Sequence, residues 1–186
     1  MKGIIFNLLE EVVTQGHGEE VWDELLDAAQ VDGVFTSLGN YPDEDLFKLV
    51  GAASAALNQT PDTIVRWFGV QALPLLAHKY PAFFAKHIAT RPFVLTLNAI
   101  IHPEVRKLYP GAEPPMFDFD TSSPDVLVMG YYSQRKLCAL AEGFVEGAAA
   151  HFGERVRIVH GRCMQRGDSS CRLELSFSAP VPGAGE

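Results

Sequence analysis

The hydrophobic period of the sequence changes at Pro114-Pro115, and this change constrains the fold more than any other feature. Before it, apolar residues recur with the 3.6-residue spacing of amphipathic helices, and after it they alternate with a period of two. The later region also holds a helical pattern from Gln134 to about Phe152. Helices followed by paired strands predict an α+β fold with an antiparallel sheet, not a doubly wound fold. The expected strands are Met116–Asp120, Asp125–Met129, Arg155–His160 and Cys171–Phe177.

The region before Pro114 is expected to be helical throughout. Thr60 followed by Pro61 is a start signal, with Thr60 as N-cap and Pro61 in the first helical position. Gly69 and Pro74 are expected to perturb the helix that begins there. The expected helices include Ile4–Val13, Val21–Ala29, Asp43–Leu57, Pro61 to about Phe68, and Phe93 to about Leu108.

Composition excludes several classes of protein. A chain of 186 residues with 47% hydrophobic and 20% charged residues can bury a sizeable core, so wholesale disorder is excluded. The net charge of −8 argues against binding to nucleic acid or to an anionic membrane. We see no transmembrane stretch and no signal peptide, and we expect a cytoplasmic protein. Disulfides are rare there, so the three cysteines need another explanation.

The first candidate functional residue is His102, which directly follows the mostly apolar segment Leu97–Ile101. A histidine in an apolar helix is commonly a satisfied core residue. The functional alternative is an axial haem ligand, because a neutral imidazole on a helix offers one nitrogen to iron while apolar neighbours cover the porphyrin.

The second candidate is the Tyr131-x-Ser133-x-Arg135 motif, where the second strand leads into the long helix. In extended backbone these three side chains emerge on one face, where two hydroxyls and a guanidinium can bind a carboxylate. The alternative is a helix N-cap at Ser133 beside a solvated arginine.

Together, His102, the downstream Pro114-Pro115 and the Tyr-x-Ser-x-Arg motif resemble the haem nitric oxide/oxygen binding (H-NOX) domains. The resemblance covers nearly the whole chain. It implies a helical N-terminal lobe and a C-terminal lobe with a four-stranded antiparallel sheet and a long helix, with haem b between the lobes. It divides the domain, residues 1–178, into a distal helical lobe of about 1–60 and a proximal helix-and-sheet lobe of about 61–178. Residues 179–186 are expected to form a flexible tail.

The resemblance also implies roles for individual residues. His102 is the expected proximal ligand of the haem iron, and Tyr131, Ser133 and Arg135 are the expected partners of the haem propionates. Pro115 and Ile5 are expected to contact the haem and distort the macrocycle.

The cysteines fall into a third pattern, with His160-x-x-Cys163 and then Cys171 on the last hairpin and Cys138 on the preceding helix. One histidine and three thiolates suit tetrahedral zinc. The alternative is that the cysteines are small buried hydrophobes and His160 lies on the surface. Some proteobacterial H-NOX proteins resemble this sequence in having such a zinc site. These thiols could also oxidise to a disulfide on losing metal, so a zinc/thiol redox sensor stays open.

Gas selectivity is expected to depend on the wall opposite His102. Dioxygen bound to ferrous haem needs a hydrogen-bond donor to persist, and dioxygen-binding members of the family supply a tyrosine where this sequence has Leu140. Phe144 is expected to line the same pocket, and Leu9 and Val70–Leu73 to complete an apolar wall, with Gln71 as the nearby amide. An apolar wall predicts binding of NO, weaker binding of CO and no stable dioxygen complex.

The resemblance therefore implies a haem-based NO sensor that is not an enzyme. NO binding would weaken or break the bond between iron and His102 and shift the two lobes. Because no further domain follows Phe177, we expect regulation of a partner in trans, a histidine kinase or a cyclic-di-GMP enzyme. The alternative is a haem enzyme handling peroxide or NO, although the other histidines are poorly placed for catalysis. A haem-free, zinc-stapled interaction domain is a further alternative.

Overall fold

The computed structural model describes residues 1–179, and residues 180–186 of the expected tail lie outside the described residues. The α-helices are α1 (Gly3–His17), α2 (Glu19–Ala29), α3 (Asp43–Leu57), α4 (Pro61–Lys79), α5 (Pro81–Phe84), α6 (Thr90–Val94), α7 (His102–Leu108) and α8 (Cys138–His151). A π-helix, η1 (Leu97–Ile101), precedes α7, and a 3₁₀ turn, η2 (Met164–Arg166), lies in the last hairpin. The strands are β1 (Met116–Asp120), β2 (Leu127–Tyr132), β3 (Arg155–Arg162) and β4 (Cys171–Ser178).

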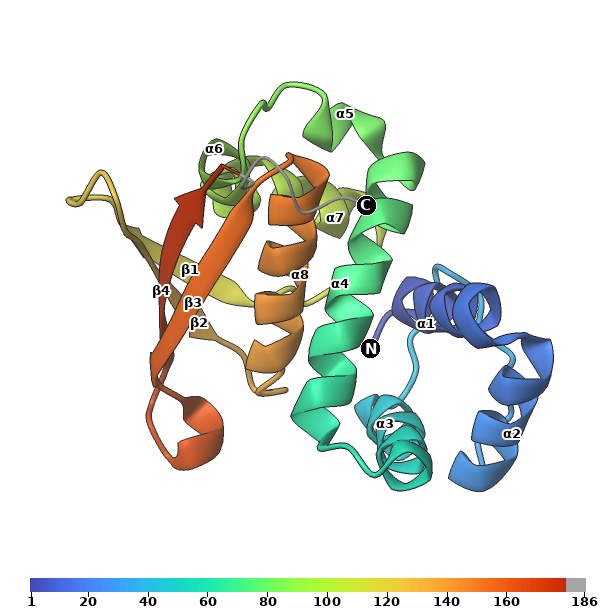
Figure 1. Cartoon of the computed structure of the whole chain (residues 1–186). Coiled ribbons are helices and arrows are strands. Elements are labelled where there is room, and N and C mark those ends of the chain that lie inside the picture. Colours follow the sequence, from blue (N-terminus) through green and yellow to red (C-terminus); the bar gives the residue numbers. More distant parts are fainter. Residues whose placement is uncertain (180–186) are drawn as a thin grey trace, which may run out of the picture.

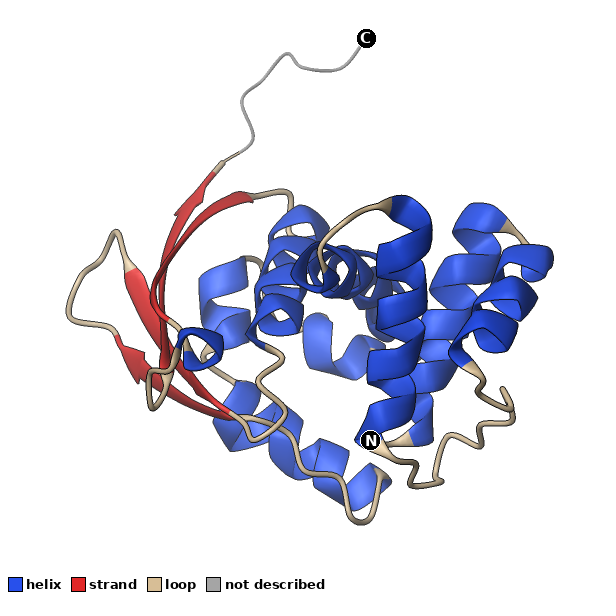
Figure 2. Cartoon of the chain, turned by 90° about the horizontal axis from the view of Figure 1, so that it is seen from below, coloured by secondary structure: helices blue, strands red, loops and turns tan. Residues whose placement is uncertain are grey.

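The four strands form one antiparallel sheet in the order β1-β2-β4-β3, which confirms the α+β prediction. Alternate residues of the two inner strands are buried, because the strand period of two sends them to one face. Helix α8 packs against that face, so the sheet lies at one side of the molecule and the helices at the other (Figures 1 and 2). No helix in residues 1–179 is both long enough and apolar enough to cross a membrane.

Two hydrophobic clusters form the core, and α4 contributes to both. One cluster joins α1, α2 and α3 to Ile64, Val65, Phe68 and Ala72 of α4. The other joins the sheet and α8 to Leu73. Figure 1 shows α4 and α8 side by side between the sheet and the N-terminal helices. These two helices therefore connect the two clusters.

Helix α4 continues to Lys79, so the expectation that it ends near Phe68 is wrong. Gly69 does not break the helix, because it is the point of close approach to α8: a Cβ there would lie 2.8 Å from the Leu140 carbonyl oxygen. Pro74 is exposed, and α4 continues through it although the missing N–H leaves the Val70 carbonyl without its usual helical donor. Packing against α8 outweighs the local preference of both residues.

Two other expected helices differ from the structure. The segment expected as one helix from Phe93 to Leu108 is α6, η1 and α7, because the amides of Ile100 and Ile101 both donate to the Thr96 carbonyl and widen the turn. Helix α8 begins at Cys138 and not at Gln134, because Lys136 takes a left-handed conformation with φ of 52°. The second strand also lies later than expected, at Leu127–Tyr132.

Candidate functional site

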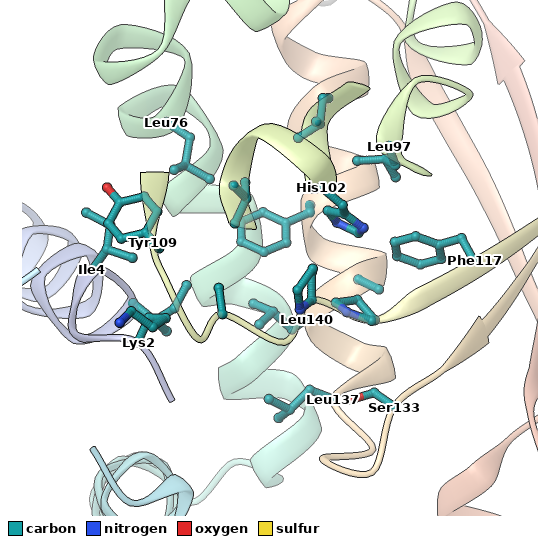
Figure 3. Close-up of a pocket in the computed structure, with 18 of the residues that line it drawn as sticks. Lys2, Ile4, Leu76, Leu97, His102, Tyr109, Phe117, Ser133, Leu137 and Leu140 are labelled. Atoms are coloured by element: carbon teal, nitrogen blue, oxygen red, sulfur yellow. The ribbon is translucent and has the colours of Figure 1, made fainter. Parts of the chain in front are cut away.

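A cavity of about 340 Å³ lies between α1, α4, α7, α8 and the inner face of β2 (Figure 3). Its volume falls within the range of small-molecule and cofactor sites, about 300–1,000 Å³. Its wall is mostly apolar, with a few polar side chains. The structure brings all eight predicted cofactor-binding residues to this wall: Ile5, His102, Pro115, Tyr131, Ser133, Arg135, Leu140 and Phe144.

His102 is the first residue of α7, and its ring faces the ring of Phe117 with centroids 5.5 Å apart. Among the described residues its side chain makes no hydrogen bond, and its Nδ1 is buried without a partner. Burial, with a smaller effect of the nearby Arg106 cation, lowers the pKa of His102 to about 4. The imidazole is therefore neutral at physiological pH, which is the form that ligates a metal.

The Tyr131, Ser133 and Arg135 side chains reach the cavity, but not as one face of an extended strand. Strand β2 ends at Tyr132, so Ser133 and Arg135 stand on the loop that follows. Arg135 donates to the Glu113 carbonyl oxygen at 3.0 Å and pairs with Asp43 of α3 at 2.8 Å. Tyr131 is deeply buried, and burial raises its pKa to about 12, so it stays a neutral hydroxyl.

The part of the wall that α8 forms is apolar, as expected from Leu140 and Phe144. Other expected members are placed differently. Leu8 lines the cavity where Leu9 was expected, and of the segment Val70–Leu73 the cavity wall includes Leu73. Gln71 is exposed and lines a separate surface hollow with Trp67, so its amide does not reach this cavity.

Three further polar residues, Lys2, Tyr80 and Tyr109, lie on the cavity wall, and no sequence pattern indicates this position for them. The hydroxyls of Tyr80 and Tyr109 bond to each other, and burial raises the pKa of Tyr109. The Lys2 ammonium donates to the carbonyl oxygens of Leu38 and Pro110. Each of these contacts joins residues far apart in the chain, so local spacing could not reveal it.

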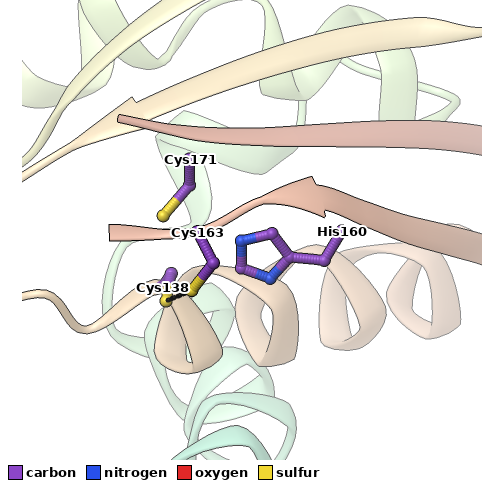
Figure 4. Close-up of side chains that lie close together, drawn as sticks. All are labelled: Cys138, His160, Cys163 and Cys171. Atoms are coloured by element: carbon purple, nitrogen blue, oxygen red, sulfur yellow. Dashed lines mark hydrogen bonds between the residues drawn. The ribbon is translucent and has the colours of Figure 1, made fainter. Parts of the chain in front are cut away.

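The three cysteines and His160 form a compact cluster with one potential ligand atom from each residue within 4.8 Å of the others (Figure 4). Cys138 begins α8, His160 lies near the end of β3, and Cys163 and Cys171 flank the hairpin that leads into β4. The Sγ atoms of Cys138 and Cys163 are 3.7 Å apart. Two thiolates on one tetrahedral zinc, each about 2.3 Å from it, stand about 3.8 Å apart. The donor set and its spacing therefore fit zinc.

The cluster is buried and close to the cavity. All three thiols are buried, and burial raises the pKa of Cys138 and of Cys171. Cys171 pairs in register with Tyr131 on the neighbouring strand, and Cys138 lies on the same helix as Leu140. One strand pair and one helix therefore contribute to both sites.

Solved structures resemble this chain over nearly its whole length. An H-NOX protein from S. oneidensis, solved by crystallography in the Fe(II)NO ligation state, is 34% identical, with a TM-score of 0.90 over 96% of this chain and 99% of its own. An H-NOX domain from Shewanella oneidensis, solved by NMR in the Fe(II)CO ligation state, is 33% identical, with a TM-score of 0.87 over 97% and 100% of the two chains. The unliganded Fe(II) H-NOX protein from K. algicida shares the fold at 24% identity, with a TM-score of 0.86 over 98% and 100%.

The family model for haem-NO-binding domains matches residues 2–160. This match includes every cavity-lining residue except Met1, the His102 helix, the Tyr131–Arg135 segment, and two of the four members of the Cys/His cluster. On both comparisons, the chain belongs to the haem-NO-binding (H-NOX) family of gas-binding haem sensors.

Proposed function

We propose that this protein is a haem-based NO sensor, with haem b held in the cavity and His102 as the axial ligand. The observation that carries the proposal is the neutral, buried imidazole of His102, which lines the cavity and has no hydrogen-bond partner among the described residues. A buried polar group without a partner is costly, so its retention in an apolar wall is explained by a ligand. Bound ferrous haem would supply the iron that binds NO, and NO binding would weaken or break the bond between this iron and His102.

Other residues of the wall would hold the haem and select the gas that binds to it. Tyr131, Ser133 and Arg135 supply two hydroxyls and a guanidinium, which suit the two propionates. Pro115 and Ile5 would press on the macrocycle from the wall. Leu140 and Phe144 offer no hydrogen-bond donor, so their side of the cavity would favour NO, and CO more weakly, over dioxygen.

The segment around His102 has features that suit a movement of α7 in response to NO binding. The side chain of His102 is not hydrogen-bonded to any described residue, and η1 directly before it is a π-helix, a form that recurs at functional sites. Loss of the bond between iron and His102 would leave α7 free to move relative to α8 and the sheet. We propose that this movement shifts the two lobes and regulates a histidine kinase or a cyclic-di-GMP enzyme in trans in the cytoplasm.

A sensor accounts for the cavity better than a haem enzyme. Peroxidase-type chemistry uses polar distal catalysts, commonly a histidine or an arginine. Of the six histidines, His102 is the one on the cavity wall, and the other five lie elsewhere in residues 1–179. Arg135 is the arginine on the wall, and its guanidinium is paired with Asp43.

Exposure of the ferrous protein first to air and then to NO tests the sensor. We expect an absorption spectrum that is unchanged in air and changed by NO. A lasting new spectrum in air alone would contradict the proposed selectivity.

We further propose that Cys138, His160, Cys163 and Cys171 hold a structural zinc ion, on the strength of their donor set and spacing. Metal analysis of the reduced protein should find about one equivalent, and much less in Cys163→Ala. Less than half an equivalent in the unmodified protein would refute the site. The 3.7 Å approach of the Cys138 and Cys163 thiols also favours a second function, redox sensing. Loss of metal would leave these thiols open to a two-electron oxidant such as hydrogen peroxide, which would join them in a disulfide and be reduced to water.

A further inference from the structure

A chain of charged side chains joins the Cys/His cluster to α4. Glu142 of α8 is 7% exposed and lies between two partners. One carboxylate oxygen is 2.6 Å from Nδ1 of His160, and the other is 2.8 Å from a terminal nitrogen of Arg66 on α4. A buried carboxylate is costly unless it is paired, so both contacts help to keep this charge inside the protein.

The contact from Glu142 determines which nitrogen of His160 is free. Nδ1 bonds the carboxylate, while Nε2 is buried and has no hydrogen-bond partner. In Figure 4 the ring of His160 points toward the three cysteines. Histidines that ligate metals commonly bond a carboxylate through their other nitrogen, which fixes the ring orientation and the tautomer.

Arg66 is placed by the close packing of α4 on α8. A Cβ on Gly143 would lie 2.1 Å from the Arg66 carbonyl oxygen, so only glycine permits this approach of the two helices. The guanidinium then lies along α8, where it also donates from Nε to Glu146 at 2.8 Å. Glu146 therefore helps to hold Arg66 in place, and Arg66 in turn holds Glu142.

We propose that Glu142 and Arg66 are positioning residues that hold Nε2 of His160 toward the three thiolates and so set the affinity of the zinc site. The inference rests on the proposed zinc site. It makes that site dependent on α4, a helix that supplies no ligand. Helices α4 and α8 also form part of the cavity wall, so the proposed zinc site and the cavity share these two helices.

Zinc affinity, measured by competition with a chromophoric chelator, tests the inference on the reduced, full-length protein. Loss of an outer contact of this kind typically weakens metal binding about 10- to 100-fold. We expect a loss in that range for Glu142→Gln and a smaller loss for Arg66→Met. Lys79→Met is the matched control, because Lys79 also lies on α4 and also pairs with a glutamate of another helix, Glu11 at 2.8 Å. Its zinc affinity should stay within about twofold of the unmodified protein.

Two further readouts separate positioning from general weakening of the fold. In a His160→Ala background, Glu142→Gln should cause no additional loss of affinity, because the carboxylate acts through the histidine. With Co²⁺ in place of zinc, the ligand-field bands should change in Glu142→Gln and not in Lys79→Met. Should Glu142→Gln fail to fold, the Arg66→Met and Lys79→Met pair decides by the same measurements.

The outcomes distinguish this inference from the proposed zinc site. If the unmodified protein binds zinc but Glu142→Gln and Arg66→Met match Lys79→Met in affinity and Co²⁺ spectrum, the positioning role is wrong and the zinc site stands. An additional loss in the His160→Ala background would also overturn it. If the unmodified protein binds less than half an equivalent, both proposals fail together.

Discussion

The contact between α4 and α8 yields a sharp prediction at Gly143. In Gly143→Ala the new methyl group would stand 2.1 Å from the Arg66 carbonyl oxygen, and α4 and α8 would have to separate by about 1.3 Å to restore an ordinary contact of 3.4 Å. Overpacking of this kind costs about 1–3 kcal/mol and occasionally more, and a backbone atom cannot rotate away. The alanine gains about 1 kcal/mol of helix propensity over glycine, which offsets part of the cost.

Gly51→Ala is the matched control for this substitution. Gly51 lies inside α3, is exposed, and has nothing within 4 Å of the position where a Cβ would stand. That variant should therefore gain up to about 1 kcal/mol, whereas Gly143→Ala should lose up to about 2 kcal/mol net.

Urea unfolding followed by far-ultraviolet circular dichroism measures both variants against the unmodified protein. The expected difference between the two variants is the overpacking cost, about 1–3 kcal/mol in the free energy of unfolding. If Gly143→Ala is as stable as Gly51→Ala, the two helices are not in backbone contact, and the packing argument fails.

The remaining predictions concern the cavity wall and the Asp43–Arg135 pair. Leu140→Tyr should give a ferrous spectrum that changes in air, because its hydroxyl supplies the missing hydrogen-bond donor, whereas Leu140→Phe should not; identical behaviour of the two variants would refute the argument. A second prediction concerns the acid dependence of stability through Asp43. Burial acts to raise the pKa of Asp43, but hydrogen bonds from the Met1 amino group and Arg135 lower this pKa below its ordinary value. A carboxyl of this kind stabilises the fold above its unfolded pKa of about 4, and that stability is lost as pH falls through the lowered folded value. Asp43→Asn should therefore lower the urea midpoint at neutral pH and flatten its acid dependence, and an unchanged pH profile would exclude the pairing.

Local periodicity predicted those elements whose form depends on neighbouring residues. The helix Asp43–Leu57 has the predicted bounds, and Thr60 caps α4 by accepting a hydrogen bond from the Thr63 amide. Gly69 does not perturb α4 as expected, because its role depends on α8, about 70 residues later in the chain. No local pattern distinguishes a glycine that ends a helix from one that admits a partner helix.

In the candidate site, too, some residues are indicated by their chemistry in the sequence, and others have a role that only the fold reveals. His102, the Tyr131–Arg135 segment and the four Cys/His residues carry chemistry in their residue types, so sequence alone indicated them. Glu142 and Arg66 did not stand out, since a glutamate in a helix is ordinarily solvated and only the fold reveals its burial. The hydrogen bond between Tyr80 and Tyr109 likewise depends on the fold, since the two residues lie 29 positions apart in the chain.

The most direct test of the central claim is the absorption spectrum of the ferrous protein with and without substitution of His102. We expect a Soret band in the unmodified protein and in His78→Ala, whose histidine is exposed on α4. In His102→Ala the band should be lost or shifted, and added imidazole should restore it by taking the place of the missing side chain. A His102→Ala protein whose Soret band matches that of the unmodified protein in position and intensity would contradict the assignment of His102.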